Sequence, residues 1–303
     1  MTITELLMLG AAGIFAGILA GFLGIGGGTV LVPLLVALNY APVQAVATSG
    51  LSIVITAISG SIQNWRMGYL SLSQVAGIGF PAVITAQIGA YLAGIFPPYL
   101  LLLTFGLLLW LNIFLIEFRN HLTANQNAEA APGELGTEAG QGENAQLAIT
   151  NTSATSASLS TITVSTSDQL PHNSNILFNP IFAKIATGSA AGLLAGLFGV
   201  GGGVIMVPLQ ILLLGESIKT AIQTSLGVIV ITAISATAGH AVHGNVLWVV
   251  GLILGGGGLL GAQVSTRFLP KLPDRIVSLA FRSLLAILSI YVFWQAWQKF
   301  SNG

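Results

Sequence analysis

Long apolar stretches separated by short polar ones make up both ends of the chain, and a polar segment lies between them. An apolar run of about 20 residues is long enough for a helix that crosses a bilayer. In the first half the pattern predicts segments at 6–24, 29–38, 44–63, 70–94 and 98–117. In the second half it predicts segments at 181–199, 204–214, 218–239, 246–267 and 276–298. The chain is therefore predicted to be a polytopic helical membrane protein.

The two halves are copies of one unit. GFLGIGGGTVLVP at 21–33 corresponds to GLFGVGGGVIMVP at 196–208, and IVITAIS occurs at both 53–59 and 229–235. Similarity at a fixed offset indicates a duplicated structural unit. We therefore predict three parts: membrane repeat unit 1 at 1–119, a flexible cytoplasmic linker at 120–179, and membrane repeat unit 2 at 180–303. The linker is rich in Ser, Thr, Asn and Gln, a composition that buries too little apolar surface to fold.

The first two segments of each unit cannot form one straight helix. Residues 6–38 as a single helix would span about 50 Å, whereas the hydrocarbon core is about 30 Å thick. The glycine runs Gly26–Gly28 and Gly201–Gly203 mark the place where each helix breaks, because glycine weakens a helix. Irregular backbone at this depth is tolerated only inside the protein or beside a cavity. Each unit is thus predicted to begin with a broken-helix hairpin whose tip is buried.

The basic residues predict how the two units are oriented. If the units are inverted relative to each other, one side of the membrane receives Arg66, Arg119, Lys184, Lys219, Arg267, Lys271, Arg275 and Arg282, and Lys299 lies opposite. Cytoplasmic loops carry an excess of Lys and Arg. We therefore predict inverted repeats, with the linker in the cytoplasm and both termini outside.

Composition supports a membrane location, because 54% of the residues are hydrophobic and 6% are charged, against about 25% charged in soluble domains. The absence of cysteine excludes disulfides and Cys-ligated metals. The predicted fold class is all-α integral membrane, with two inverted repeats, each a broken-helix hairpin plus three transmembrane helices. The expected partners are the lipid bilayer and a small solute, with no nucleic acid.

The glycine breaks are candidates for an anion site. Inverted units with broken helices are typical of secondary transporters, and a helix that begins inside the protein presents unpaired amides to an anion. One helix end contributes about 0.3–2 kcal/mol, which is less than the cost of desolvating a charge, so two ends and further donors are needed. The predicted substrate-binding residues are Gly26, Gly27, Gly28, Thr48, Ser49, Gln87, Gly201, Gly202, Gly203, Thr224, Ser225 and Gln263.

Several of these residues have a purely structural alternative. Thr48, Ser49, Thr224 and Ser225 could be helix N-caps. Gln87 and Gln263 could pair across the repeat interface. The small-xxx-small series at Gly13, Gly17 and Gly21, repeated at Gly188, Gly192 and Gly196, is better explained by close helix packing.

Few titratable groups lie within the predicted spans. His240 is a possible coupling residue, and Asn64 occupies the matching place in the first unit. No metal site is predicted, because His240 and His243 have no further ligand nearby in the sequence. Glu216 lies at a segment end and is predicted to be solvated.

The paired motifs AGFLGIGGGTVLVP and AGLFGVGGGVIMVP, followed by ATS and QTS and by AQIGAYLAGIFP and AQVSTRFLPKLP, resemble those of the TauE/SafE sulfite-exporter family. The resemblance covers 1–119 and 180–303. It implies transport of sulfite, sulfonates or related small sulfur-containing anions across the bacterial inner membrane by a multi-pass protein with no cofactor. The long linker and the pairing of Asn64 with His240 depart from the family pattern.

Two transport mechanisms remain open at this point: a secondary carrier, and a channel-like or uniport permease for another small anion or organic acid. An intramembrane enzyme is not predicted, because the sequence has no HExxH motif and no acid pair in a span. The particular anion, the direction of transport, the coupling ion and the oligomeric state are not predicted.

Overall fold

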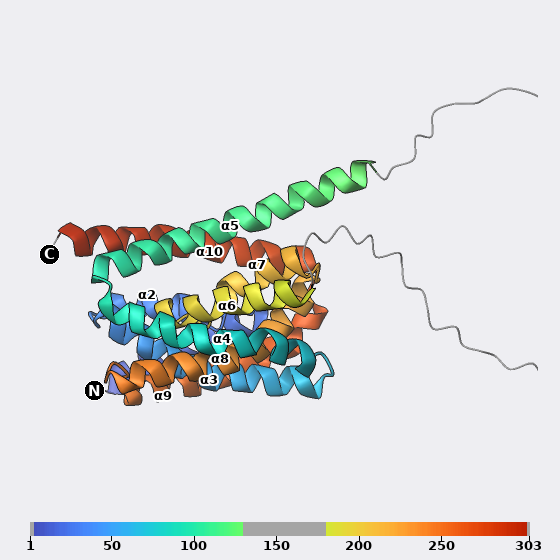
Figure 1. Cartoon of the computed structure of the whole chain (residues 1–303). Helices are drawn as coiled ribbons and strands as arrows, with labels where there is room; N and C mark the ends of the chain where they lie inside the picture. The colour runs from blue at the N-terminus through green and yellow to red at the C-terminus, as the bar shows by residue number, and fades with distance from the viewer. Residues whose placement is uncertain (1–2, 130–179, 302–303) are drawn as a thin grey trace, which may run out of the picture.

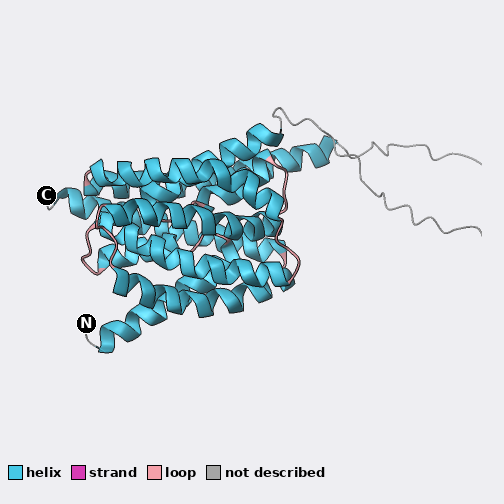
Figure 2. Cartoon of the chain, turned by 60° about the horizontal axis from the view of Figure 1, so that its bottom comes forward, coloured by secondary structure: helices cyan, strands magenta, loops and turns pink. Residues whose placement is uncertain are grey.

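The structure is a computed structural model that describes residues 3–129 and 180–301, and only helices and short loops occur among them (Figures 1 and 2). The first half contains α1 (Ile3–Leu23), α2 (Gly28–Ala37), α3 (Pro42–Arg66), α4 (Leu72–Ile95) and α5 (Pro98–Glu129). The second half contains α6 (Pro180–Phe198), α7 (Gly203–Leu213), α8 (Ile218–Val242), α9 (Trp248–Phe268), the 3-10 turn η1 (Leu269–Lys271) and α10 (Asp274–Ser301). The all-helical prediction is confirmed.

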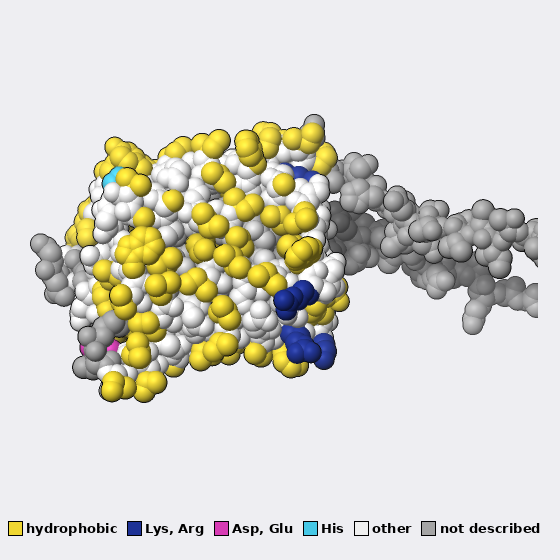
Figure 3. Space-filling view, turned by 90° about the horizontal axis from the view of Figure 1, so that it is seen from below, with side chains coloured by type: hydrophobic (Ala, Val, Ile, Leu, Met, Phe, Trp, Pro, Cys, Tyr) yellow, Lys and Arg dark blue, Asp and Glu magenta, His cyan; other side chains and the backbone are white. Residues whose placement is uncertain are grey.

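Within the described residues, seven helices are long and apolar enough to cross a membrane: α1, α3, α4, α6, α8, α9 and α10. The short helices α2 and α7 match the short predicted segments 29–38 and 204–214. The segment Pro98–Phe114 of α5 is also apolar. On the face shown in Figure 3, apolar side chains cover the middle of the molecule, and Lys and Arg side chains gather at the end next to the grey linker trace. The molecule therefore has the surface of a multi-pass membrane protein.

Two details differ from the predicted segments. Helix α5 runs to Glu129, past the predicted end of its span at 117 and into the predicted linker. The turn η1 follows α9 because Pro270 has no backbone N–H with which to continue the helix. The remainder of the predicted linker, 130–179, lies outside the described residues, as do the side chains of Arg119 and Lys299.

The two halves are packed into each other. Helix α1 lies along α9, and α6 lies along α4, so that the first helix of each half packs on the fourth helix of the other. Helices α3 and α8 pack together and are the most buried spans, with 72% and 67% of their apolar windows inside the protein. Helices α5 and α10 run side by side along one edge (Figure 1).

Close contact between these helices depends on the small-xxx-small glycines. A Cβ atom on Gly17 would lie 2.7 Å from the Cα of Gly258 in α9, and one on Gly192 would lie 2.6 Å from the Cα of Ala82 in α4. Any larger side chain would separate the backbones, so the packing explanation for these glycines is confirmed.

Both termini lie at one end of the molecule, and the end of α5 and the start of α6, which border the linker, lie toward the opposite end (Figure 1). The same figure shows α2 toward the end with the termini and α7 toward the end with the linker.

Candidate anion-binding site at the two glycine breaks

The two helix breaks have the same backbone conformation. Gly24, Gly26 and Gly27 have φ values of 66°, 75° and 78°. The matching glycines Gly199, Gly201 and Gly202 have values of 62°, 71° and 77°. Side chains with a Cβ rarely adopt this left-handed region, so only glycine gives such a sharp reversal without strain. Gly27 and Gly202 are the N-cap residues of α2 and α7, and both breaks are buried.

The three consecutive glycines of each break face three different neighbours. Gly27 and Gly202 face their own hairpin: a Cβ atom on Gly27 would lie 2.9 Å from the carbonyl oxygen of Ala16 in α1, and one on Gly202 would meet Ala191 in α6. These two glycines allow each hairpin to close on itself.

Gly28 and Gly203 face the break of the opposite half. A Cβ atom on Gly28 would lie 2.8 Å from the Cα of Val200, and one on Gly203 would lie 2.9 Å from the Cα of Ile25. The two hairpin tips therefore touch each other, backbone against backbone, inside the protein. The first amides of α2 and α7, which have no partner within their helices, begin at this junction.

Gly26 and Gly201 face a pair of isoleucines. A Cβ atom on Gly26 would lie 3.2 Å from Ile53 Cγ2 and 3.4 Å from Ile229 Cγ2. A Cβ atom on Gly201 would lie 3.1 Å from Ile53 Cγ2 and 2.9 Å from Ile229 Cγ2. Ile53 and Ile229 are fully buried and form a small apolar cluster with Ala57 and Ala233. In this conformation the isoleucine pair fills the space beside the glycine tips.

Ile53 and Ile229 were not among the site residues predicted from the sequence. The available signal was the IVITAIS motif, which is identical in both units and begins with these residues. Its apolar side chains gave no reason to expect contact with an anion-binding backbone.

Two of the predicted hydroxyls hold the breaks in place. The Ser49 hydroxyl donates to the carbonyl oxygen of Gly199 at 2.8 Å, and the Ser225 hydroxyl donates to that of Gly24 at 2.9 Å. Each serine thus binds the break of the opposite half. The N-cap alternative is wrong for these residues, because the N-caps of α3 and α8 are Ala41 and Ser217.

The predicted threonines contact other elements. Thr48 Oγ1 accepts a hydrogen bond of 3.1 Å from the backbone N–H of Leu247, the N-cap residue of α9. Thr224 Oγ1 donates to Gln74 Oε1 in α4 at 3.3 Å. The structure therefore does not bring the two threonines together at the glycine tips in this conformation.

Of the two predicted glutamines, Gln87 in α4 binds α8 of the other half. Gln87 Nε2 donates to the carbonyl oxygen of Ser235 at 2.6 Å and lies 3.0 Å from its hydroxyl. The alternative that Gln87 pairs across the repeat interface is confirmed. Gln263 is half-buried in α9.

His240 and Asn64 are both buried at matching places. His240 Nε2 lies 2.8 Å from the carbonyl oxygen of Gly196, and its Nδ1 has no partner. Neither polar atom of the Asn64 amide has a partner. Within the described part of the chain, no three His, Asp or Glu residues come together as potential metal ligands.

The prediction for Glu216 is wrong. Both of its carboxylate oxygens are buried in the loop between α7 and α8, next to the side chain of Gln74. The chain position at a helix end suggested solvation, but α4 and α6 cover the carboxyl group with Gln74 and Lys184.

A separate cavity of about 770 Å³ opens between α2, the α4–α5 connection and α10. It is lined by aromatic and amide residues that include Tyr99, Tyr291, Trp294 and Gln295. None of the predicted site residues lines it.

Comparisons with known proteins agree on the kind of protein. The family model described as "Sulfite exporter TauE/SafE" matches residues 9–292. The probable membrane transporter protein YunE of Bacillus subtilis is 25% identical over 293 residues, which cover 93% of this chain and 95% of that protein. A probable membrane transporter protein of Xylella fastidiosa strain 9a5c is 25% identical over 303 residues, which cover 98% of each chain.

A probable membrane transporter protein of Haemophilus influenzae is 35% identical over 120 residues, which cover 37% of this chain and 46% of that protein. No solved structure matches the chain. The chain belongs to the TauE/SafE sulfite exporter family and is a multi-pass membrane transporter.

Proposed function

We propose that the protein is a secondary transporter that moves sulfite, a sulfonate or a related small sulfur-containing anion across the bacterial inner membrane. The observation that carries the proposal is the contact between the two glycine breaks, where Gly28 faces Val200 and Gly203 faces Ile25. Two helix N-termini thereby converge on one buried place, and each favours negative charge. The breaks use neutral donors, which can bind an anion and release it again.

In this proposal, the structure represents the closed state of the transporter. Ile53 and Ile229 lie against Gly26 and Gly201 and leave no room for an anion beside the backbone. A carrier needs such an apolar closure between its two open states, since a continuous polar path would leak. Opening requires the isoleucines to move away from the glycine tips, together with a shift of one half against the other.

Inverted orientation of the two units is part of the proposal. It is supported by the reciprocal packing of α1 on α9 and α6 on α4, and by the placement of α2 and α7 toward opposite ends (Figure 1). The chain has no cysteine, so single cysteines can report the side to which a residue is exposed. Ala41→Cys and Thr220→Cys, both exposed at the starts of α3 and α8, should react with an impermeant thiol reagent from opposite sides. Reaction from the same side would contradict the inverted arrangement.

Uptake of labelled sulfite, sulfate, thiosulfate and a sulfonate into proteoliposomes tests the choice of substrate. We expect uptake of at least one of the sulfur anions, saturable and competed by the unlabelled anion. The proposed function would be overturned if all four anions entered protein-free liposomes as fast as they enter proteoliposomes. A channel-like permease for another small anion is the second candidate, and it predicts flux that does not saturate and shows no counterflow.

A further inference from the structure

Glu216 is a buried carboxyl group close to the surface of the molecule. Its neighbours in the chain, Gly215 and Ser217, are exposed, but both of its carboxylate oxygens are buried. A carboxyl group whose oxygens are shielded from water is costly to keep charged.

The carboxyl group is connected to a predicted site residue through α4. Gln74 lies beside Glu216, and its Oε1 accepts the hydrogen bond of 3.3 Å from Thr224 Oγ1. Gln74 belongs to the first unit, whereas Glu216 and Thr224 belong to the second. The three side chains therefore form a polar row across the interface between the units.

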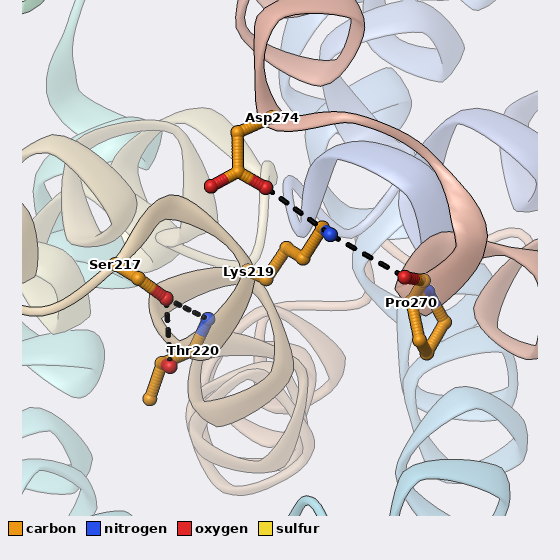
Figure 4. A network of polar contacts seen from close by, with 5 residues as sticks. All are labelled: Ser217, Lys219, Thr220, Pro270 and Asp274. Atoms are coloured by element: carbon orange, nitrogen blue, oxygen red, sulfur yellow. Dashed lines mark hydrogen bonds and ion pairs between the residues drawn. The ribbon is translucent and has the colours of Figure 1, made fainter.

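Two opposing effects act on the pKa of the Glu216 carboxyl group. Burial raises the pKa of the Glu216 carboxyl above its ordinary value of 4.5, while Lys184 of α6 and Gln74 of α4 act in the opposite direction. Lys219, at the start of α8, is engaged elsewhere: its Nζ lies 3.2 Å from Asp274 Oδ1 and 3.3 Å from the carbonyl oxygen of Pro270 (Figure 4). The side chains of α5 beyond Phe114 lie outside the described residues. The positive charge of Lys184 acts on the carboxyl group.

The matching places in the first unit carry no such group. Tyr40 and Ala41 occupy the loop that corresponds to Glu216, Val250 corresponds to Gln74, and Leu9 corresponds to Lys184. A feature required only for folding the duplicated unit would be expected in both copies. Glu216, Lys184 and Gln74 therefore occur together at only one of the two matching places, the one near the linker.

We propose that Glu216 is the proton-binding residue that couples anion transport to protons, an inference that rests on the proposed function. When ionised, the carboxylate places a negative charge beside Gln74 and Thr224 and repels an entering anion. When a carboxylate oxygen takes a proton from water at the linker end, the charge is removed and the neutral group can donate a hydrogen bond. Anion and proton then pass together, and the proton returns to water when the anion leaves.

The test compares wild type with Glu216→Gln, Glu216→Asp and Glu5→Gln in proteoliposomes under imposed pH gradients. Glu5 is an exposed acid near the N-terminus and serves as the control. If one proton accompanies each anion, a gradient of one pH unit should change anion accumulation by about tenfold in wild type and Glu5→Gln. Glu216→Gln should still exchange labelled for unlabelled anion but accumulate none in response to the gradient. Glu216→Asp should retain the response with a shifted pH dependence.

Gradient-driven accumulation by Glu216→Gln equal to that of wild type would overturn the inference. Infrared difference spectra across a pH titration provide a second readout that needs no substrate. The stretching band of a protonated carboxyl should be lost in Glu216→Gln and kept in Glu5→Gln. If wild type moves none of the four anions, the proposed function fails, while the infrared titration still decides whether Glu216 binds the proton. An unchanged carboxyl band in Glu216→Gln would refute the assignment.

Discussion

The hydroxyl of Ser49 lies 2.8 Å from the carbonyl oxygen of Gly199, so a side chain of the first half holds the helix break of the second. The reverse contact joins Ser225 to Gly24 at 2.9 Å. A buried carbonyl that the helix leaves unpaired is costly, and each serine satisfies one in the opposite half. The two breaks are consequently fixed as a pair.

Ser49→Ala and Ser225→Ala should each lower the free energy of unfolding by about 1–3 kcal/mol, because each leaves a buried carbonyl without its donor. Thermal unfolding of the purified protein in detergent measures the change. Ser52→Ala is the matched control, since Ser52 is buried in the same helix and its hydroxyl has no partner. A loss of stability in Ser52→Ala as large as in Ser49→Ala would contradict the assigned role.

Gly27→Ala should destabilise the protein, because a Cβ atom in the left-handed region costs about 1–2 kcal/mol and would also lie 2.9 Å from the carbonyl oxygen of Ala16. Gly10→Ala, in the same hairpin, has no atom within 4 Å of its Cβ and should gain about 0.5–1 kcal/mol from helix propensity. The two melting temperatures should therefore move in opposite directions. Equal shifts would show that the break does not depend on the glycine conformation.

The double variant Ile53→Val and Ile229→Val should transport faster than wild type. Each change removes the Cδ1 atom that lies near Gly28 or Gly203 and so widens the closed junction between the tips. The expected loss of stability is about 0.5–1.5 kcal/mol per site. Ile78→Val, at a fully buried position in α4, should cost a similar amount without altering the rate of anion uptake. Matching uptake rates in the two variants would argue against the isoleucine closure.

Glu216 should make stability depend on pH. Because its folded-state pKa is raised above 4.5, the folded state holds the proton more tightly than the unfolded state. Its contribution is fully present below pH 4.5 and is lost as pH rises through the folded-state pKa. Thermal unfolding should thus show Glu216→Gln gaining stability relative to wild type as pH increases.

Lys184→Met provides the complementary measurement. Lys184 lowers the pKa of Glu216, so its removal should raise that pKa further and extend the same pH dependence to higher pH. A stability difference between wild type and Glu216→Gln that does not vary with pH would contradict the buried-carboxyl assignment.

Much of the fold follows from the sequence. The glycine runs located both helix breaks, since left-handed backbone is a local property that residue type largely decides. Except at the end of α5, the apolar runs located the helices to within a few residues, because a span of given hydropathy has a limited choice of length. The extension of α5 to Glu129 was missed because its polar sequence carries no membrane signal.

The site was only partly predictable. The sequence located Ser49 and Ser225 as polar groups in an apolar setting, but not that each would reach the opposite break. It also gave no indication that Ile53 would lie against both Gly26 and Gly201, because these contacts join residues distant in the chain.

The sequence by itself determined that this protein is a duplicated set of membrane helices, each copy interrupted by a glycine turn, because hydropathy and glycine conformation act over a few neighbouring residues. Only the tertiary structure decided which face each glycine turns to its neighbours, that the two tips meet, and that the carboxylate oxygens of Glu216 are buried. Burial and contact depend on how helices from the two halves pack, and packing is set by all the surrounding side chains together.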